Sequence, residues 1–118
     1  MRHVLALVLA LAGAGVSAEE VTSAPGALLR ALDKVSGETT DLEVARGATV
    51  PFGRLAVSLS DCRYPVADPS ANAYAHLTIV DTATGAAAFD GWMVAASPAL
   101  SALDDPRYDV WVIRCRSE

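Results

Sequence analysis

The chain has 118 residues, of which 14 are acidic and 9 are lysine or arginine, so its formal net charge is −5. Binding to the phosphates of a nucleic acid needs a basic surface, and this charge balance therefore argues against a nucleic-acid partner. A chain of this size forms one core with little stability to spare, so we expect a single domain that gains from additional stabilisation.

Residues 1–18 have the layout of a cleavable secretory signal. Arg2 and His3 precede an apolar run, and the segment closes with Val16-Ser17-Ala18. The apolar run is shorter than the about 20 residues that a membrane-spanning helix needs. We therefore expect cleavage after Ala18 and export of a protein that does not span the membrane.

Residues 19–26 are polar and turn-prone, and we expect a flexible leader here, with ordered structure starting near Ala27. Beyond this point, short runs of alternating apolar and polar residues are separated by turn signals, a pattern typical of antiparallel strands in a sandwich or barrel. One alternating strand is predicted at residues 55–60. The predicted hairpins join residues 29–35 to 38–44 through Ser36-Gly37, and residues 75–79 to 88–95 through the turn at 81–85.

The last third of the chain contains one predicted helix and one predicted central strand. A serine and a proline that suit a helix start, followed by leucines three residues apart, predict a helix of one or two turns near residues 98–104. Residues 108–115 are rich in β-branched and aromatic side chains and predict a central strand. Residues 27–118 are thus predicted to form one all-β domain, a small antiparallel β-sandwich or barrel-like fold with one short helix.

Two cysteines, Cys62 and Cys115, lie 53 positions apart. An exported protein reaches an oxidising compartment, where thiols normally pair, so we predict a Cys62–Cys115 disulfide. Strand parity opposes this pairing, because Cys115 is in phase with the apolar Trp111 whereas Cys62 is in phase with the polar Ser60. A bulge or a strand end near Asp61 is required to reconcile the two.

Three arginines flank these cysteines, namely Arg63, Arg114 and Arg116. If the bridge forms, they gather into a cationic patch, and guanidinium groups bind carboxylates and phosphates through paired hydrogen bonds. One hypothesis is that the patch binds an envelope protein or another acidic ligand. The alternative is that nearby acidic residues neutralise the arginines; the candidates are Asp61, Asp109 and Glu118.

The aromatic residues offer a second candidate surface. Trp92, Tyr64 and Tyr74 are candidates for a ligand groove of the kind that aromatic side chains form in sugar-binding proteins. Trp111 and Tyr108 belong to the apolar final run, and we expect both in the core. Exposure of Trp92 beside Tyr64 or Tyr74 would indicate a binding surface.

Acid–base chemistry has one candidate set, formed by His76 with Asp104, Asp105 and Asp109. The same aspartates also suit a turn before Pro106, and a lone histidine on the polar face of a strand is usually a surface residue. The sequence has no zinc, calcium, phosphate-loop or nucleophile-elbow motif. We therefore predict that the protein is not an enzyme and that it uses no metal or cofactor.

Several blocks of the chain carry a family resemblance: residues 32–37, Phe52-Gly53, Cys62-Arg63-Tyr64-Pro65, the run GWMVAASPALSAL at 91–103, and YDVWV at 108–112 with Cys115. They resemble an uncharacterised family of exported alphaproteobacterial proteins, defined as a domain of unknown function. The resemblance covers residues 28–115 and implies a periplasmic location in a Gram-negative cell. It carries over no catalytic residue.

The predicted function is that of a non-catalytic periplasmic binding or envelope-assembly module. Two alternatives stay open. One is a small envelope hydrolase that uses His76 with Asp104, Asp105 or Asp109. The other is a structural accessory subunit of an envelope complex, which an unusually large apolar surface patch would indicate.

Overall fold

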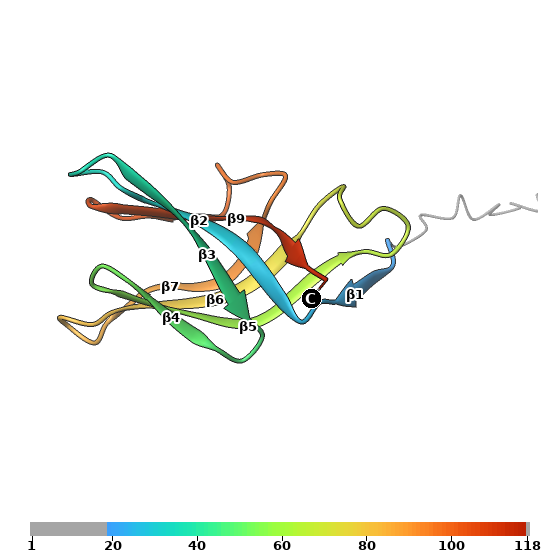
Figure 1. The fold of residues 1–118 in the computed structure, drawn as a ribbon, viewed down its shortest axis with the longest axis horizontal. Helices are drawn as coiled ribbons and strands as arrows, with labels where there is room; N and C mark the ends of the chain where they lie inside the picture. The colour runs from blue at the N-terminus through green and yellow to red at the C-terminus, as the bar shows by residue number, and fades with distance from the viewer. Residues whose placement is uncertain (1–18, 118) are drawn as a thin grey trace, which may run out of the picture.

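The computed structural model describes residues 19–117. The predicted signal at residues 1–18 lies outside the described residues, as does Glu118. Within the described part, every regular element is a strand, and the strands form two antiparallel sheets that face each other (Figure 1). The structure is therefore all-β.

Sheet A has the strand order β1-β5-β6-β7, with β4 paired to the first part of β5. Its strands are β1 (Val21–Ser23), β4 (Thr49–Phe52), β5 (Leu55–Pro65), β6 (Tyr74–Asp81) and β7 (Ala87–Val94). Sheet B has the order β3-β2-β9-β8. Its strands are β2 (Gly26–Asp33), β3 (Glu38–Ala45), β8 (Leu103–Asp104) and β9 (Tyr108–Arg116).

Both predicted hairpins are confirmed. β2 and β3 pair from Gly26↔Ala45 to Asp33↔Glu38, and β6 pairs with β7 across the turn that contains Gly85. Gly37 and Gly85 adopt positive φ angles of 76° and 74°, which glycine reaches without the steric cost that a side chain imposes. β9 lies between β2 and β8, as predicted for a central strand, although β8 pairs only with Asp109 and Val110.

The core lies between the inner faces of the two sheets. Alternate residues of β5, namely Leu55, Val57 and Leu59, are at most 2% exposed, and the inner residues of β6 are equally buried. Sheet B contributes alternate residues of β2 and β9 to the same cluster. Because burial alternates with exposure along each strand, each sheet keeps an outer face that is available for other contacts.

Two features of the predicted architecture are corrected. The sheets form separate ladders, so the fold is a sandwich and not a closed barrel. The helix predicted near residues 98–104 was wrong, because this segment forms turns and then β8. Leu103 pairs with Val110 and is 5% exposed, whereas Leu100 is 86% exposed, so the two leucines do not share a buried face. A segment this short forms few helical hydrogen bonds, and the tertiary pairing of β8 outweighs them.

Strand pairing also starts earlier in the chain than Ala27. Val21–Ser23 form β1 and pair with the end of β5, and Ala24 is 1% exposed in the core. No helix in the described part of the chain has the length and apolar character needed to cross a membrane.

Candidate binding surfaces beside the disulfide

Cys62 and Cys115 form a disulfide that joins β5 of sheet A to β9 of sheet B, which confirms the predicted pairing. The two Cα atoms are 5.7 Å apart, and Cys62 is fully buried. The bridge therefore ties the two sheets together at the end of the sandwich where β1 pairs with β5 (Figure 1).

Two bulges turn both cysteines toward the interior. In β5 the register shifts between Leu59 and Asp61, so Ser60 is the extra residue. Of the two alternatives predicted near Asp61, a bulge or a strand end, the bulge is the one observed. A second shift, between the partners of Leu28 and Leu29, leaves Ile113 as an extra residue in β9. Each bulge inverts the alternation of its strand once, so both cysteines point inward.

The second bulge also explains a correction to β9. The core residues of this strand are Tyr108, Val110 and Val112, whereas Trp111 is half-buried on the outer face. The prediction of a core position was right for Tyr108 and wrong for Trp111. Trp111 lines a surface hollow with Asp109 and residues 98–100 and 102–104.

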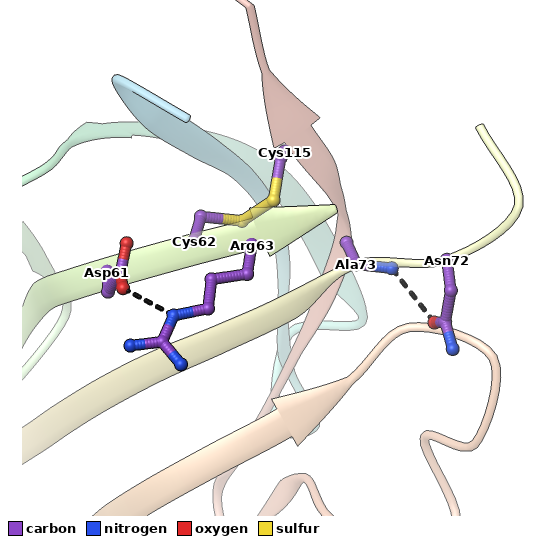
Figure 2. The surroundings of a disulfide bond; sticks show 6 residues. All are labelled: Asp61, Cys62, Arg63, Asn72, Ala73 and Cys115. Carbon is purple, nitrogen blue, oxygen red and sulfur yellow. Dashed lines mark hydrogen bonds and ion pairs between the residues drawn. A yellow bond between two sulfur atoms is a disulfide. The ribbon is translucent and has the colours of Figure 1, made fainter. Parts of the chain in front are cut away.

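Arg63 lies on the outer face of sheet A, beside the buried Cys62. Its Nε atom donates a hydrogen bond of 2.8 Å to Oδ2 of Asp61. Figure 2 shows the disulfide leaving β5 toward β9 and the Arg63 side chain directed toward Asp61. Burial raises the pKa of the Asp61 carboxyl, but the hydrogen bond and positive charge of Arg63, together with hydrogen bonds from Ser23 and the Cys62 backbone, lower this pKa by more, so it lies below the ordinary value. Of the three predicted neutralising residues, Asp61 pairs with Arg63, Asp109 binds Lys34, and Glu118 lies outside the described residues.

Cross-strand pairing places Arg63 close to Trp92. Residues that are paired across neighbouring strands point to the same face of the sheet. Asp61, His76 and Trp92 are paired in this way and form one row on the outer face of sheet A. The Arg63 guanidinium carbon lies 4.9 Å from the centre of the Trp92 ring, and the His76 ring meets this ring edge-on at 5.1 Å. These contacts hold the indole in place as a cation–π and aromatic cluster.

These residues border an open concavity of about 350 Å³, which we call the Trp92 hollow. It is lined by Glu19, Val21, Arg63, Tyr74 and Trp92. Trp92 is 39% exposed, and the Tyr74 hydroxyl donates a 3.3 Å hydrogen bond to Oε1 of Glu19. The sequence condition for a binding surface, an exposed Trp92 beside Tyr74, is therefore met.

Asn72 supports the edge of the Trp92 hollow. Its Oδ1 atom accepts hydrogen bonds from the backbone N–H groups of Ala73 and Ala96, and its Nδ2 atom donates to the Tyr74 hydroxyl. The Asn72–Ala73 bond is visible in Figure 2. Asn72 thus ties the start of β6 to the end of β7 and orients Tyr74.

A second concavity lies at the end of β9, and we call it the β9 groove. Its volume is about 710 Å³, and its lining consists of Tyr64, Pro69 and Ser70 on one side and residues 113–117 on the other. Arg114 and Arg116 therefore lie here, with Tyr64, and away from the Trp92 hollow. The structure divides the predicted cationic patch between two surfaces.

The candidate acid–base set is not brought together. Asp104 and Asp109 lie at the edge of sheet B, where both bind Nζ of Lys34, at 2.6 and 2.9 Å. The hydrogen bonds that Lys34 donates to these carboxylates raise the pKa of Lys34, and the bond to Asp104 lowers the pKa of Asp104. Asp105 accepts hydrogen bonds from the backbone of Arg107 and Tyr108, which is the predicted turn role.

His76, in contrast, is on the outer face of sheet A. Its Nδ1 atom is buried and has no hydrogen-bond partner among residues 19–117. An acid–base pair needs a carboxylate within hydrogen-bond reach of the imidazole. Asp104 and Asp109 lie on sheet B, whereas His76 lies on sheet A. No group of three or more metal-ligating side chains occurs in this part of the chain either.

Residues 27–115 match a protein family described as "Uncharacterized protein conserved in bacteria (DUF2155)". The chain belongs to this family. The match confirms the resemblance to a family with a domain of unknown function, while the restriction of the family to alphaproteobacteria stays a prediction. No curated protein and no solved structure matches the chain.

Three residues of the Trp92 hollow and its rim were not singled out from the sequence as binding residues. Glu19 and Val21 belong to the segment predicted as a flexible leader, and Asn72 belongs to a loop. A weak signal for β1 exists in Val21 and Thr22, which are β-branched residues of the kind that favours strands. Their place beside Arg63 depends on the pairing of β1 with β5, which local patterns do not specify.

Proposed function

We propose that this protein is a non-catalytic binding module of the bacterial periplasm and that the Trp92 hollow binds a neutral carbohydrate chain of the envelope. The observation that carries the proposal is the exposed Trp92 ring beside Tyr74, in a hollow with accessible polar groups. Export follows from the predicted signal at residues 1–18, and the disulfide is compatible with an oxidising compartment.

The shape and composition of the hollow favour a small amphipathic ligand. Its volume of about 350 Å³ is within the roughly 300–1,000 Å³ range of small-ligand sites. Among residues 19–117, five large apolar side chains are exposed, and two of these, Val21 and Trp92, line this hollow. A sugar ring has an apolar face that packs on aromatic rings and hydroxyl groups that bind polar side chains at its rim.

The charges of the hollow favour a neutral ligand over an acidic one. Arg63 is paired with Asp61, and Glu19 adds a further carboxylate. An anion placed here meets no net positive charge, because the α-amino group that cleavage creates on Glu19 is balanced by the carboxylate of the same residue. Glu19, Tyr74 and Arg63 still supply hydrogen-bond acceptors and donors for hydroxyl groups. Cleavage after Ala18 makes Glu19 the first residue, so the rim of the hollow belongs to the exported form.

The absence of catalysis is part of the proposal. It is supported by the separation of His76 from Asp104, Asp105 and Asp109, and by the Lys34 ion pairs that engage two of these aspartates. Binding without turnover is the behaviour that such a surface supports.

The test is calorimetric titration of the chain that starts at Glu19 with soluble N-acetylglucosamine oligosaccharides. Trp92→Ala removes the central ring and should weaken binding by about 30-fold or more, the effect of a residue at the centre of an interface. Leu100→Ala truncates another exposed apolar side chain outside the hollow and should leave binding unchanged. Equal affinity of the wild type and Trp92→Ala, or shortened oligosaccharides in the mass spectrum, would contradict the proposal.

A further inference from the structure

One edge of β9 is largely unpaired. β2 pairs with β9 along its whole length, but on the other side β8 covers only Asp109 and Val110. From Trp111 to Arg116 no described strand pairs with this edge, and no other backbone hydrogen bond from residues 19–117 reaches it. Unpaired N–H and C=O groups of an edge strand are a template for another extended chain.

The β9 groove runs along this free edge. Five consecutive residues, 113–117, line it. Beyond the bulge at Ile113, the side chains from Arg114 to Arg116 alternate between the two faces of the sheet, so a groove that touches all three residues meets the strand at its edge. β2 occupies the opposite edge, and the groove therefore lies against the free one. Tyr64, Pro69 and Ser70 form the far wall.

The groove is cationic in an acidic protein. Arg114 is exposed, and no carboxylate among residues 19–117 lies within 4.0 Å of its guanidinium group. The guanidinium of Arg116 has a distant partner, with Nη1 3.9 Å from Oε2 of Glu43. The net charge of the chain is −5. The charge of Arg114 also acts on Asp41 and lowers its pKa, but Asp41 is already paired with Arg30 at 2.8 Å. The two arginines of the groove are thus only weakly compensated, which favours an occupant with carboxylate groups.

We propose that the β9 groove binds an extended acidic segment of a partner protein, which adds to sheet B as a further strand beside β9. Main-chain hydrogen bonds to the free edge supply affinity, and carboxylates opposite Arg114 and Arg116 supply selectivity. Tyr64, Pro69 and Ile113 give apolar contacts, so the segment alternates acidic and apolar residues. A second copy of this chain fits less well, because pairing of two β9 edges brings the arginines of both copies together.

The probe for this site is a short peptide in which glutamate alternates with valine. Binding should slow the hydrogen exchange of backbone amides between Trp111 and Arg116. The same peptide methylated on alternate backbone nitrogens keeps its side chains but cannot complete the strand pairing, and it should not bind. A lysine–valine peptide should not bind either.

Arg114→Gln and Arg116→Gln should each weaken binding of the glutamate–valine peptide by about threefold, and the double variant by about tenfold. Arg54→Gln removes the same charge from the β4–β5 turn and should bind as the wild type does.

Three results overturn the proposal: no binding of the glutamate–valine peptide, equal binding of its methylated form, or equal binding by the double arginine variant. A dimer of the wild type in sedimentation that the peptide does not dissociate also overturns it. Loss of oligosaccharide binding at the Trp92 hollow has no effect on these outcomes, so the two proposals fail separately.

Discussion

The Trp92 hollow and the β9 groove flank the two ends of one disulfide, yet their arginines are in opposite electrostatic settings. Arg63, next to Cys62, is paired with Asp61 at 2.8 Å and lies over the Trp92 ring. Arg114, next to Cys115, has no carboxylate within 4.0 Å among residues 19–117. Sequence neighbours of bridged cysteines therefore do not form one patch. An arginine is neutralised or left available for a ligand according to its own surroundings: Asp61, two residues before Arg63 on the same strand, pairs with Arg63, and Arg114 has no such partner.

The largest expected effect comes from the disulfide that the two surfaces share. Replacement of Cys62 and Cys115 by alanine removes a cross-link between positions 53 apart. The free energy of unfolding should fall by about 4 kcal/mol, the chain-entropy value for such a loop. Urea unfolding followed by circular dichroism measures this change. The reduced wild type is the matched control and should behave like the variant; a loss below about 1 kcal/mol in both would show that the bridge is not a main source of stability.

Smaller losses of unfolding free energy are expected from substitutions on the two faces of β7. Met93 is fully buried in a row with Cys62 and Ala75, whereas its neighbour Trp92 is on the outer face. Met93→Ala should cost about 3 kcal/mol of unfolding free energy because it leaves a cavity. Trp92→Ala should cost about 1 kcal/mol, since the contacts it loses are partly exposed. If thermal and urea unfolding rank the two variants in the reverse order, the outer-face position of Trp92 is wrong.

The smallest expected effect is a change in the pKa of Asp61, which should depend on Arg63 and not on Arg114. In Arg63→Gln the burial of Asp61 persists while its hydrogen bond to Arg63 is lost, so the pKa of Asp61 should rise. A carboxyl whose pKa is depressed in the folded state stabilises the fold above its unfolded pKa, and this stability is lost as the pH falls through the folded value. In the variant this contribution to stability is absent at neutral pH, so the stability of the variant should fall less between neutral and acidic pH than that of the wild type. An NMR titration of the Asp61 carboxyl carbon measures the shift.

The matched variant is Arg114→Gln, which should leave the Asp61 titration unchanged because Arg114 lies in the β9 groove. A rise of equal size in both variants would mean that the arginines act as one patch after all.

Local patterns predicted the hairpins, the Cys62–Cys115 bridge and the bulge near Asp61, because each depends on turn residues, pairing of thiols or strand parity. They failed where both faces of a strand are apolar. In β9, Tyr108 and Val110 alternate with Trp111 and Ile113, so periodicity alone does not select the inner face. The helix near 98–104 failed for a related reason, since the pairing of Leu103 with Val110 is a long-range contact.

The residues of the candidate surfaces were predictable, but their grouping was not. The sequence grouped Arg63 with Arg114 and Arg116, and Tyr64 with Tyr74 and Trp92. The structure instead places Arg63 with Tyr74 and Trp92, and Tyr64 with the other two arginines. Their division depends on the register between strands and on the placement of β1, which brings Val21 to the hollow. These are tertiary properties that the short-range pattern does not encode.

The most direct measurement of the central claim uses the two tryptophans of the chain, Trp92 and Trp111. Each indole N–H gives one signal in a proton–nitrogen NMR spectrum, and Trp111 on the outer face of sheet B is a built-in control. Titration with N-acetylglucosamine oligosaccharides should shift the Trp92 signal in a saturable way and leave the Trp111 signal in place. A shift of Trp111 alone, or no shift of either signal at saturating sugar, would contradict a carbohydrate site at the Trp92 hollow.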